Sequence, residues 1–118
     1  MPFKTDLIVK ADIPHDGMWI VHDPLEYVTN SGVDIVIPVG FPTDLASIPR
    51  IAQSVIEVNG KHRRAAVIHD YLYHFGIGTR EEADNILKEA MLSDGVGEDE
   101  AEIIYEAVRL GGASHWKT

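Results

Sequence analysis

The 118-residue sequence contains no cysteine, which excludes disulfide bonds, cysteine-ligated zinc and a thiol nucleophile. Positive charge is also scarce, because ten Lys and Arg face 19 Asp and Glu, for a formal net charge of −9. That charge disfavours phosphate backbones, so we expect no nucleic-acid partner. No apolar run approaches the ~20 residues of a transmembrane segment, and the N-terminus lacks the apolar stretch of a signal peptide.

The chain does contain enough apolar residues for one folded domain over residues 1–118. Its hydrophobic content of 45% and charged content of 25% are ordinary for a globular protein with one core. Acidic residues are concentrated after position 80, where the pattern predicts solvated helix faces.

Short runs rich in β-branched and aromatic residues, separated by turn formers, dominate residues 1–42. In residues 33–41 apolar side chains alternate with others, as in a strand with one buried face. The run at 25–29 and the Asn-Ser-Gly turn at 30–32 predict an antiparallel hairpin with it. Residues 43–60 are expected to form a loop and a short helix.

The remaining residues, 61–118, show helical periodicity. The first helix, from about 62 to 75, is apolar on nearly every side and ends at a glycine turn. The second begins with a capping box formed by Thr79 and Glu82. The third covers about 98–111. Strands followed by helices predict an α+β fold, with a small N-terminal antiparallel β-sheet packed against three C-terminal α-helices.

Two adjacent ionisable residues, His69 and Asp70, lie in the middle of the apolar first helix. Buried charges are costly unless they are paired, whereas a neutral imidazole can act as a general base. A carboxylate that accepts a ring N–H would fix the imidazole tautomer, and Asp84 is the best candidate across the glycine turn. Asp70 points about 100° away from His69 on a helix. With Asp44 from the preceding loop, it could hold a hard cation such as Ca²⁺.

Each of these residues also has a purely structural interpretation. His69 and Tyr73 can be core residues that find hydrogen-bond partners inside the fold. Asp84 stands four residues after an arginine, so a surface ion pair within one helix would explain it. Asp44 can cap a short helix, and Asp70 can pair with Arg63 or Arg64 at the surface.

Several stretches together resemble the small tailed-phage and prophage family known as DUF1353. They are residues 40–50 (GFPTDLASIPR), 65–73 (AAVIHDYLY), 80–84 (REEAD) and 105–111, with Trp116. The resemblance covers nearly the whole chain and implies a phage-encoded protein without a settled activity. The absence of cysteine fits a location in the host cytoplasm or the virion, and a phage protein could have other phage structural proteins as partners.

A second, local resemblance concerns His69-Asp70-x-x-Tyr73 and the later Ala83-Asp84. This pattern is similar to the active-site helices of phospholipase A2, in particular the disulfide-free phospholipase domains of parvovirus capsids. The resemblance implies that His69 activates water, that Asp70 binds calcium, and that Tyr73 and Asp84 support the base. The glycine-rich calcium loop of phospholipases is not evident directly before the first helix.

Three functions are therefore open. The first is a calcium-dependent ester hydrolase acting on host envelope lipid, with His69, Asp84 and Tyr73 as catalytic candidates and Asp70 and Asp44 as metal ligands. The second is a non-enzymatic virion, tail, baseplate or assembly protein. The third is a metal-dependent peptidase or amidase acting on the cell wall.

Overall fold

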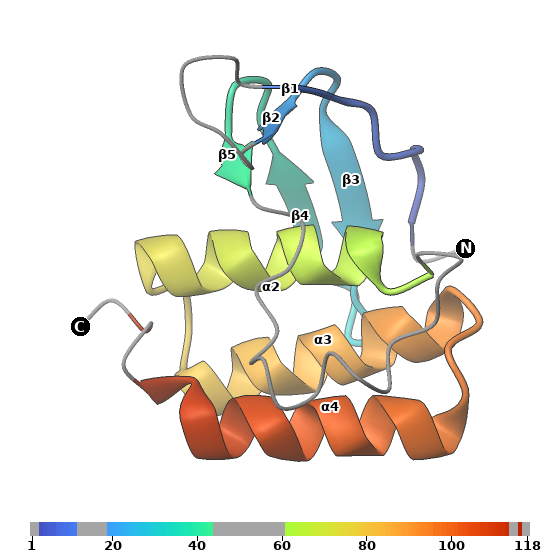
Figure 1. Cartoon of the computed structure of the whole chain (residues 1–118). Helices are drawn as coiled ribbons and strands as arrows, with labels where there is room; N and C mark the ends of the chain where they lie inside the picture. The colour runs from blue at the N-terminus through green and yellow to red at the C-terminus, as the bar shows by residue number, and fades with distance from the viewer. Residues whose placement is uncertain (1–2, 12–18, 44–60, 114–115, 117–118) are drawn as a thin grey trace.

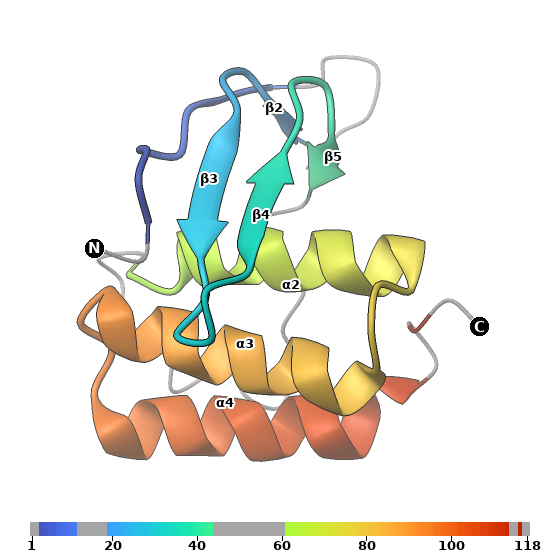
Figure 2. The same cartoon turned by 180° about the vertical axis from the view of Figure 1, so that it is seen from behind.

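Five short strands and three helices are stacked in layers in the computed structural model, which describes residues 3–11, 19–43, 61–113 and 116. The strands lie on one side of α2, and α3 and α4 lie on the other (Figures 1 and 2). This arrangement confirms the predicted α+β class, with strands first and helices after them. Within the described residues, no helix has both the length and the apolar content needed to span a membrane.

The strands form two small antiparallel sheets rather than the single sheet that the sequence predicted. One sheet has the order β1-β2-β5 and the other pairs β3 with β4. The chain bends at Asp23 between β2 and β3, and the following Pro24 has no N–H for a ladder hydrogen bond. The strand bounds are β1 Val9–Ala11, β2 Trp19–Val21, β3 Leu25–Val28, β4 Asp34–Ile37 and β5 Pro42–Thr43.

The hairpin of β3 and β4 is the one that the sequence predicted. Leu25 pairs with Ile37 and Tyr27 with Ile35, and all four side chains are buried on one face. Gly32 closes the turn with a φ of 90°, a left-handed conformation that favours glycine. This face of the hairpin packs on α2.

The three helices are α2 (Arg63–Phe75), α3 (Arg80–Ser93) and α4 (Glu98–Gly111). Gly76 ends α2 in the left-handed conformation, as the predicted glycine turn requires. The capping box at the start of α3 is also confirmed, because Thr79 and Glu82 bind each other's backbone N–H groups. Thr43, expected in the loop, instead ends β5, and the rest of that segment, including Asp44, lies outside the described residues.

A continuous hydrophobic core runs from the hairpin through α2 to α3 and α4. Because α2 is covered from both sides, it is buried over most of its surface, in agreement with its apolar sequence. Each fully buried aliphatic side chain contributes about 1.5–3 kcal/mol of transfer free energy. The largest fully buried side chains of the core are Tyr27, Leu25, Ile37, Ile68, Leu87, Met91 and Ile104.

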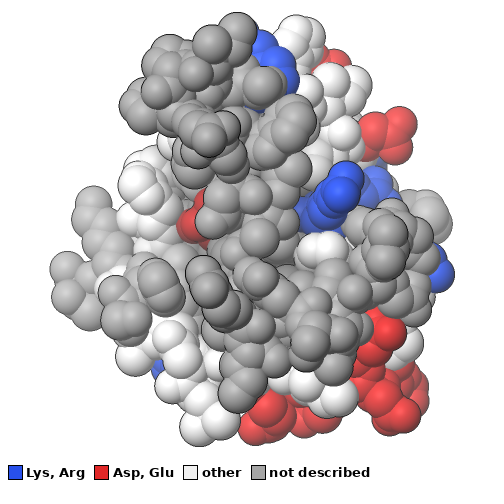
Figure 3. Space-filling view, in the orientation of Figure 1, with Lys and Arg blue, Asp and Glu red and all other residues white. Residues whose placement is uncertain are grey.

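The acidic residues after position 80 follow the predicted pattern only in part, because Glu89 and Asp94 are partly buried and Asp84 is fully buried. The first turn of α4 carries three of them, Glu98, Asp99 and Glu100. Acidic side chains gather at the lower edge of the molecule, where α4 lies (Figure 3). In the described part of the chain, Asp84 is the acidic residue that is fully buried, with no exposed surface.

Candidate active site

His69 and Asp84 meet inside the helix hairpin formed by α2 and α3. The His69 Nε2 atom lies 2.7 Å from Asp84 Oδ1, and the two side chains are 2% and 0% exposed. The left-handed Gly76 reverses the chain, and the Thr79 cap starts α3 so that it runs back along α2. The contact that the sequence predicted between these two residues is therefore present.

Tyr73 lies one helical turn after His69 and joins the same carboxylate. Its hydroxyl donates to Asp84 Oδ1 at 2.6 Å, and its ring centroid is 4.2 Å from the His69 ring. Residues four apart on a helix share a face, which explains why both side chains reach Asp84. Burial raises the pKa of Tyr73, and the hydrogen bond to Asp84 raises it further. The hydroxyl therefore stays protonated and acts as a donor at neutral pH.

Arg109 completes the cluster from the third helix. Its Nη1 atom donates to Asp84 Oδ2 at 2.9 Å, so both carboxylate oxygens are bound. We call His69, Tyr73, Asp84 and Arg109 the Asp84 cluster. Sequence reasoning missed Arg109, because nothing local in the sequence links the last turn of α4 to Asp84.

Arg80 has a different role from the ion pair with Asp84 that its position suggested. Its Nη2 atom donates to the carbonyl oxygens of Val108, at 3.1 Å, and Arg109. The Val108 carbonyl also accepts the Gly112 N–H, and Arg80 adds a side-chain donor at this helix end, where carbonyls run short of partners. Arg80 thereby fixes the start of α3 to the end of α4, and among the described residues it is Arg109 that forms the ion pair with Asp84.

The Asp84 carboxylate is ionised at neutral pH despite its burial. Burial favours the neutral form, but the hydrogen bonds from His69, Tyr73 and Arg109 together outweigh it and hold the pKa of Asp84 below its ordinary value of 3.8. Arg109 already supplies a positive charge next to this carboxylate. With a neutral imidazole whose Nε2–H donates to Asp84, the cluster would hold one positive and one negative charge.

The second ring nitrogen of His69 is the unusual atom of the site. Nδ1 is buried and has no hydrogen-bond partner among the described residues. Most buried polar atoms in proteins have a partner, so an unpaired one requires an explanation. When Nε2 carries the proton, Nδ1 holds the lone pair and can accept a proton from a bound molecule.

Of the two predicted calcium ligands, the structure describes only Asp70. Asp70 is partly buried on α2, whereas Asp44 lies outside the described part of the chain. Within that part, no group of three or more His, Asp or Glu residues is arranged to hold a metal ion. Calcium also accepts backbone carbonyls and water, so its binding by Asp70 and Asp44 stays a prediction. Arg64, one suggested partner of Asp70, donates to Asp94 through Nε at 2.9 Å and Nη2 at 2.5 Å.

Fold and site together define a class of protein: an α+β protein in which a buried aspartate on the second of three helices binds a buried histidine and tyrosine and a partly exposed arginine. The chain belongs to the family described as "Protein of unknown function (DUF1353)", whose model matches residues 19–108. The matched segment includes His69, Tyr73 and Asp84 and ends one residue before Arg109. No curated protein and no solved structure matches the chain. The similarity to phospholipase A2 therefore stays a prediction from the local motif.

Proposed function

We propose that this protein is a hydrolase in which His69 is the general base. The observation that carries the proposal is the bonding of the imidazole: Nε2 is held by Asp84, and Nδ1 is buried without a partner among the described residues. An imidazole held in this way has one fixed tautomer and one nitrogen available for proton transfer. A carboxylate on the opposite nitrogen stabilises the imidazolium that forms during the reaction.

In the proposed reaction, a water molecule attacks the carbonyl carbon of an ester. As its oxygen forms the new bond, the water gives one proton to His69 Nδ1. The tetrahedral intermediate then collapses, the bond to the leaving oxygen breaks, and the imidazolium returns the proton to that oxygen. Asp84 remains ionised throughout, and Tyr73 and Arg109 keep it oriented through their hydrogen bonds.

The phospholipase-like motif supports an ester of a host envelope lipid as the substrate and calcium as the cofactor. Asp70 and Asp44 would be the carboxylates that hold the ion. Bound calcium would polarise the ester carbonyl and stabilise the negative charge that develops on its oxygen.

A non-enzymatic role in the phage particle or its assembly is the second candidate. The observation that favours it is that the Asp84 cluster joins α2, α3 and α4 through three hydrogen bonds to one fully buried carboxylate. Under this function, the cluster would fix the packing of the helices, and the surface of the protein would bind other proteins of the particle.

A comparison of two histidines on α2 separates these functions. His69→Gln removes the base, whereas His74→Gln changes an exposed histidine on the same helix. We expect His69→Gln to lower the rate of phospholipid ester hydrolysis by about 10²–10⁴-fold, the usual contribution of a general base. His74→Gln should retain the rate. If a folded His69→Gln protein hydrolyses esters as fast as the unchanged protein, or if neither shows turnover, the base assignment is wrong.

A calcium titration with a thermal-unfolding readout tests the cofactor. Ligand at about 100 times its dissociation constant stabilises the folded state by about 2.7 kcal/mol, so the melting temperature should rise. Asp70→Asn should reduce that rise. A melting temperature that does not respond to millimolar calcium would contradict calcium binding.

A further inference from the structure

Two described residues that follow α4, Gly112 and Trp116, lie against Tyr73 of the candidate site. The last described residues of the chain lie at the end of the molecule where α2 ends and α3 begins (Figures 1 and 2). These residues come after the segment matched by the family model, which stops at residue 108. The Asp84 cluster therefore has a wall that the matched segment does not contain.

Gly112 forms the part of this wall next to the Tyr73 hydroxyl. It is buried and ends α4, with its N–H donating to the carbonyl of Val108 at 2.8 Å. A Cβ atom at this position would lie 2.8 Å from the Tyr73 hydroxyl oxygen and 2.5 Å from the Val108 carbonyl oxygen. Both distances are shorter than carbon–oxygen contact allows, so only glycine leaves the hydroxyl where it donates to Asp84.

Trp116 forms the part of the wall next to the Tyr73 ring. The two rings meet edge to face at 89°, with centroids 5.1 Å apart, which is a favourable geometry for an aromatic pair. The Trp116 backbone N–H donates to the carbonyl of Ala113 at 3.3 Å. The Tyr73 ring also contacts His69, so His69 and Trp116 both restrict its position.

We propose that Gly112 and Trp116 are positioning residues that hold the Tyr73 hydroxyl on Asp84 and thereby fix the imidazole of His69. The coupling passes through Asp84 Oδ1, because this one oxygen accepts from both Tyr73 and His69. If the Tyr73 ring shifts, Oδ1 loses one of its two donors and the carboxylate can turn away from His69. An effect of Gly112 and Trp116 on catalysis rests on the proposed function. Their geometric part, the effect on the orientation of His69, does not.

The geometric part is tested on the full chain without substrate, by ¹⁵N NMR of the imidazole nitrogens of His69. We expect the unchanged protein to show the Nε2–H tautomer with a hydrogen-bonded proton. Trp116→Ala should shift this signal and speed the exchange of the proton with water. Leu110→Ala is the matched control, because Leu110 is in the last turn of α4 but is 88% exposed. Trp116→Phe, which keeps an aromatic ring, should restore most of the signal.

A double-variant cycle shows whether Trp116 acts through the Tyr73 hydroxyl. Tyr73→Phe removes that hydroxyl, so adding Trp116→Ala should then leave the His69 signal and the hydrolysis rate nearly unchanged. In the presence of the hydroxyl, Trp116→Ala should lower kcat by about 10–100-fold with little change in KM, as for a misplaced catalytic group. Gly112→Ala should act in the same direction.

Two results would overturn the inference. One is a His69 signal that stays the same in folded Trp116→Ala and Gly112→Ala. The other is an effect of Trp116→Ala that is as large with Tyr73→Phe as without it, because Trp116 would then act by another route. If the signals respond as expected but the unchanged protein hydrolyses no ester, the positioning inference holds and the proposed hydrolase function fails.

Discussion

Two carboxylates of α3, five residues apart, each accept a tyrosine hydroxyl, but their surroundings differ. Tyr73 donates to Asp84 at 2.6 Å, and Tyr27 donates to Glu89 at 2.5 Å. Burial raises the pKa of both tyrosines, and the bound carboxylate adds to this increase in each case. Up to this point the two pairs follow the same physical chemistry.

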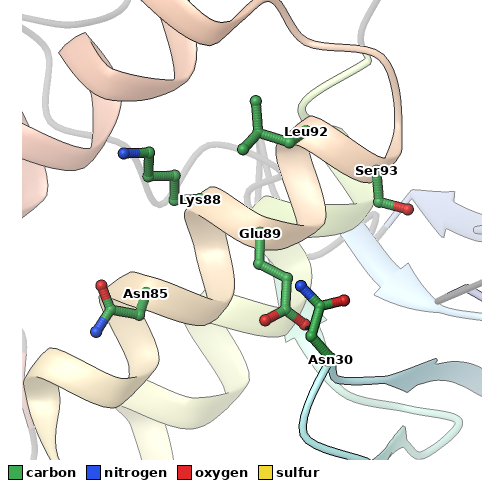
Figure 4. A pocket seen from close by; sticks show the side chains of 6 residues that line it. All are labelled: Asn30, Asn85, Lys88, Glu89, Leu92 and Ser93. Carbon is green, nitrogen blue, oxygen red and sulfur yellow. Dashed lines mark hydrogen bonds between the residues drawn. The ribbon is translucent and has the colours of Figure 1, made fainter.

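Glu89 uses its remaining contacts to hold the sheet. Its Oε1 atom also accepts the backbone N–H of Asn30 at 2.8 Å, which ties the turn between β3 and β4 to α3. The Glu89 side chain is partly buried and lines a surface pocket (Figure 4). The lining residues come from that turn and from one face of α3: Asn30, Asn85, Lys88, Glu89, Leu92 and Ser93.

Asp84 is closed from water and binds a different set of donors. Its two oxygens accept from His69, Tyr73 and Arg109, so it combines a hydroxyl, an imidazole and a guanidinium. The Glu89 side chain, in contrast, bonds only to a hydroxyl and a backbone amide among the described residues. Hydrogen bonds from a tyrosine to a carboxylate of α3 therefore join elements of this fold at two places. What distinguishes the Asp84 cluster is the imidazole whose second nitrogen has no described partner.

Neutralising each carboxylate should give the largest difference between the two pairs. We expect Asp84→Asn to lower the free energy of unfolding by about 3 kcal/mol, because a buried charge pair loses one partner. Glu89→Gln should cost about 1 kcal/mol, the value of an ordinary hydrogen bond. Urea unfolding at neutral pH measures both. Similar losses for the two variants would show that the burial of Asp84 adds nothing to its role.

Removing each tyrosine hydroxyl should give matched losses of stability and unmatched losses of activity. Tyr73→Phe and Tyr27→Phe each delete one hydrogen bond to a carboxylate and should each cost about 1–3 kcal/mol. Tyr73→Phe should also slow ester hydrolysis, whereas Tyr27→Phe should leave the rate unchanged. Steady-state kinetics on folded variants would contradict the proposed site if both, or neither, reduced kcat.

Acid should remove the contribution of Asp84 to stability. Its folded-state pKa lies below its ordinary value of 3.8, so the ionised carboxylate stabilises the folded state above that pH. This contribution is lost as the pH falls through the lower folded-state pKa. The difference in unfolding free energy between the unchanged protein and Asp84→Asn should therefore be constant near neutral pH and shrink below about pH 4. A difference that grows in acid would reverse the direction assigned to this pKa.

The smallest effect is expected at the solvent-exposed ion pair between Lys88 and Glu102. These side chains are 36% and 47% exposed, and screening by water removes most of the attraction between such charges. Lys88→Met should leave the melting temperature and the hydrolysis rate within experimental error of the unchanged protein. A clear decrease would mean that the junction of α3 and α4 depends on this pair.

Local signals in the sequence were sufficient for the helix hairpin and for its central contact. The left-handed Gly76 and the capping box of Thr79 and Glu82 are short-range features, so they fix where α2 ends and α3 begins. Helical periodicity then places His69 and Asp84 on facing sides. The β3–β4 hairpin was predictable for a similar reason, since its turn residues and alternating apolar side chains lie close together in the chain.

Only the tertiary structure decided the contacts that cross from α4. Arg109 binds Asp84 across 25 residues, and Trp116 reaches Tyr73 across 43. Arg80 binds the carbonyls at the end of α4 instead of a carboxylate on its own helix. These contacts depend on how α4 docks, and docking is set by the summed packing of many side chains rather than by any local motif. The sequence by itself determined the pair at the centre of the site, and the packing of the third helix determined what encloses it.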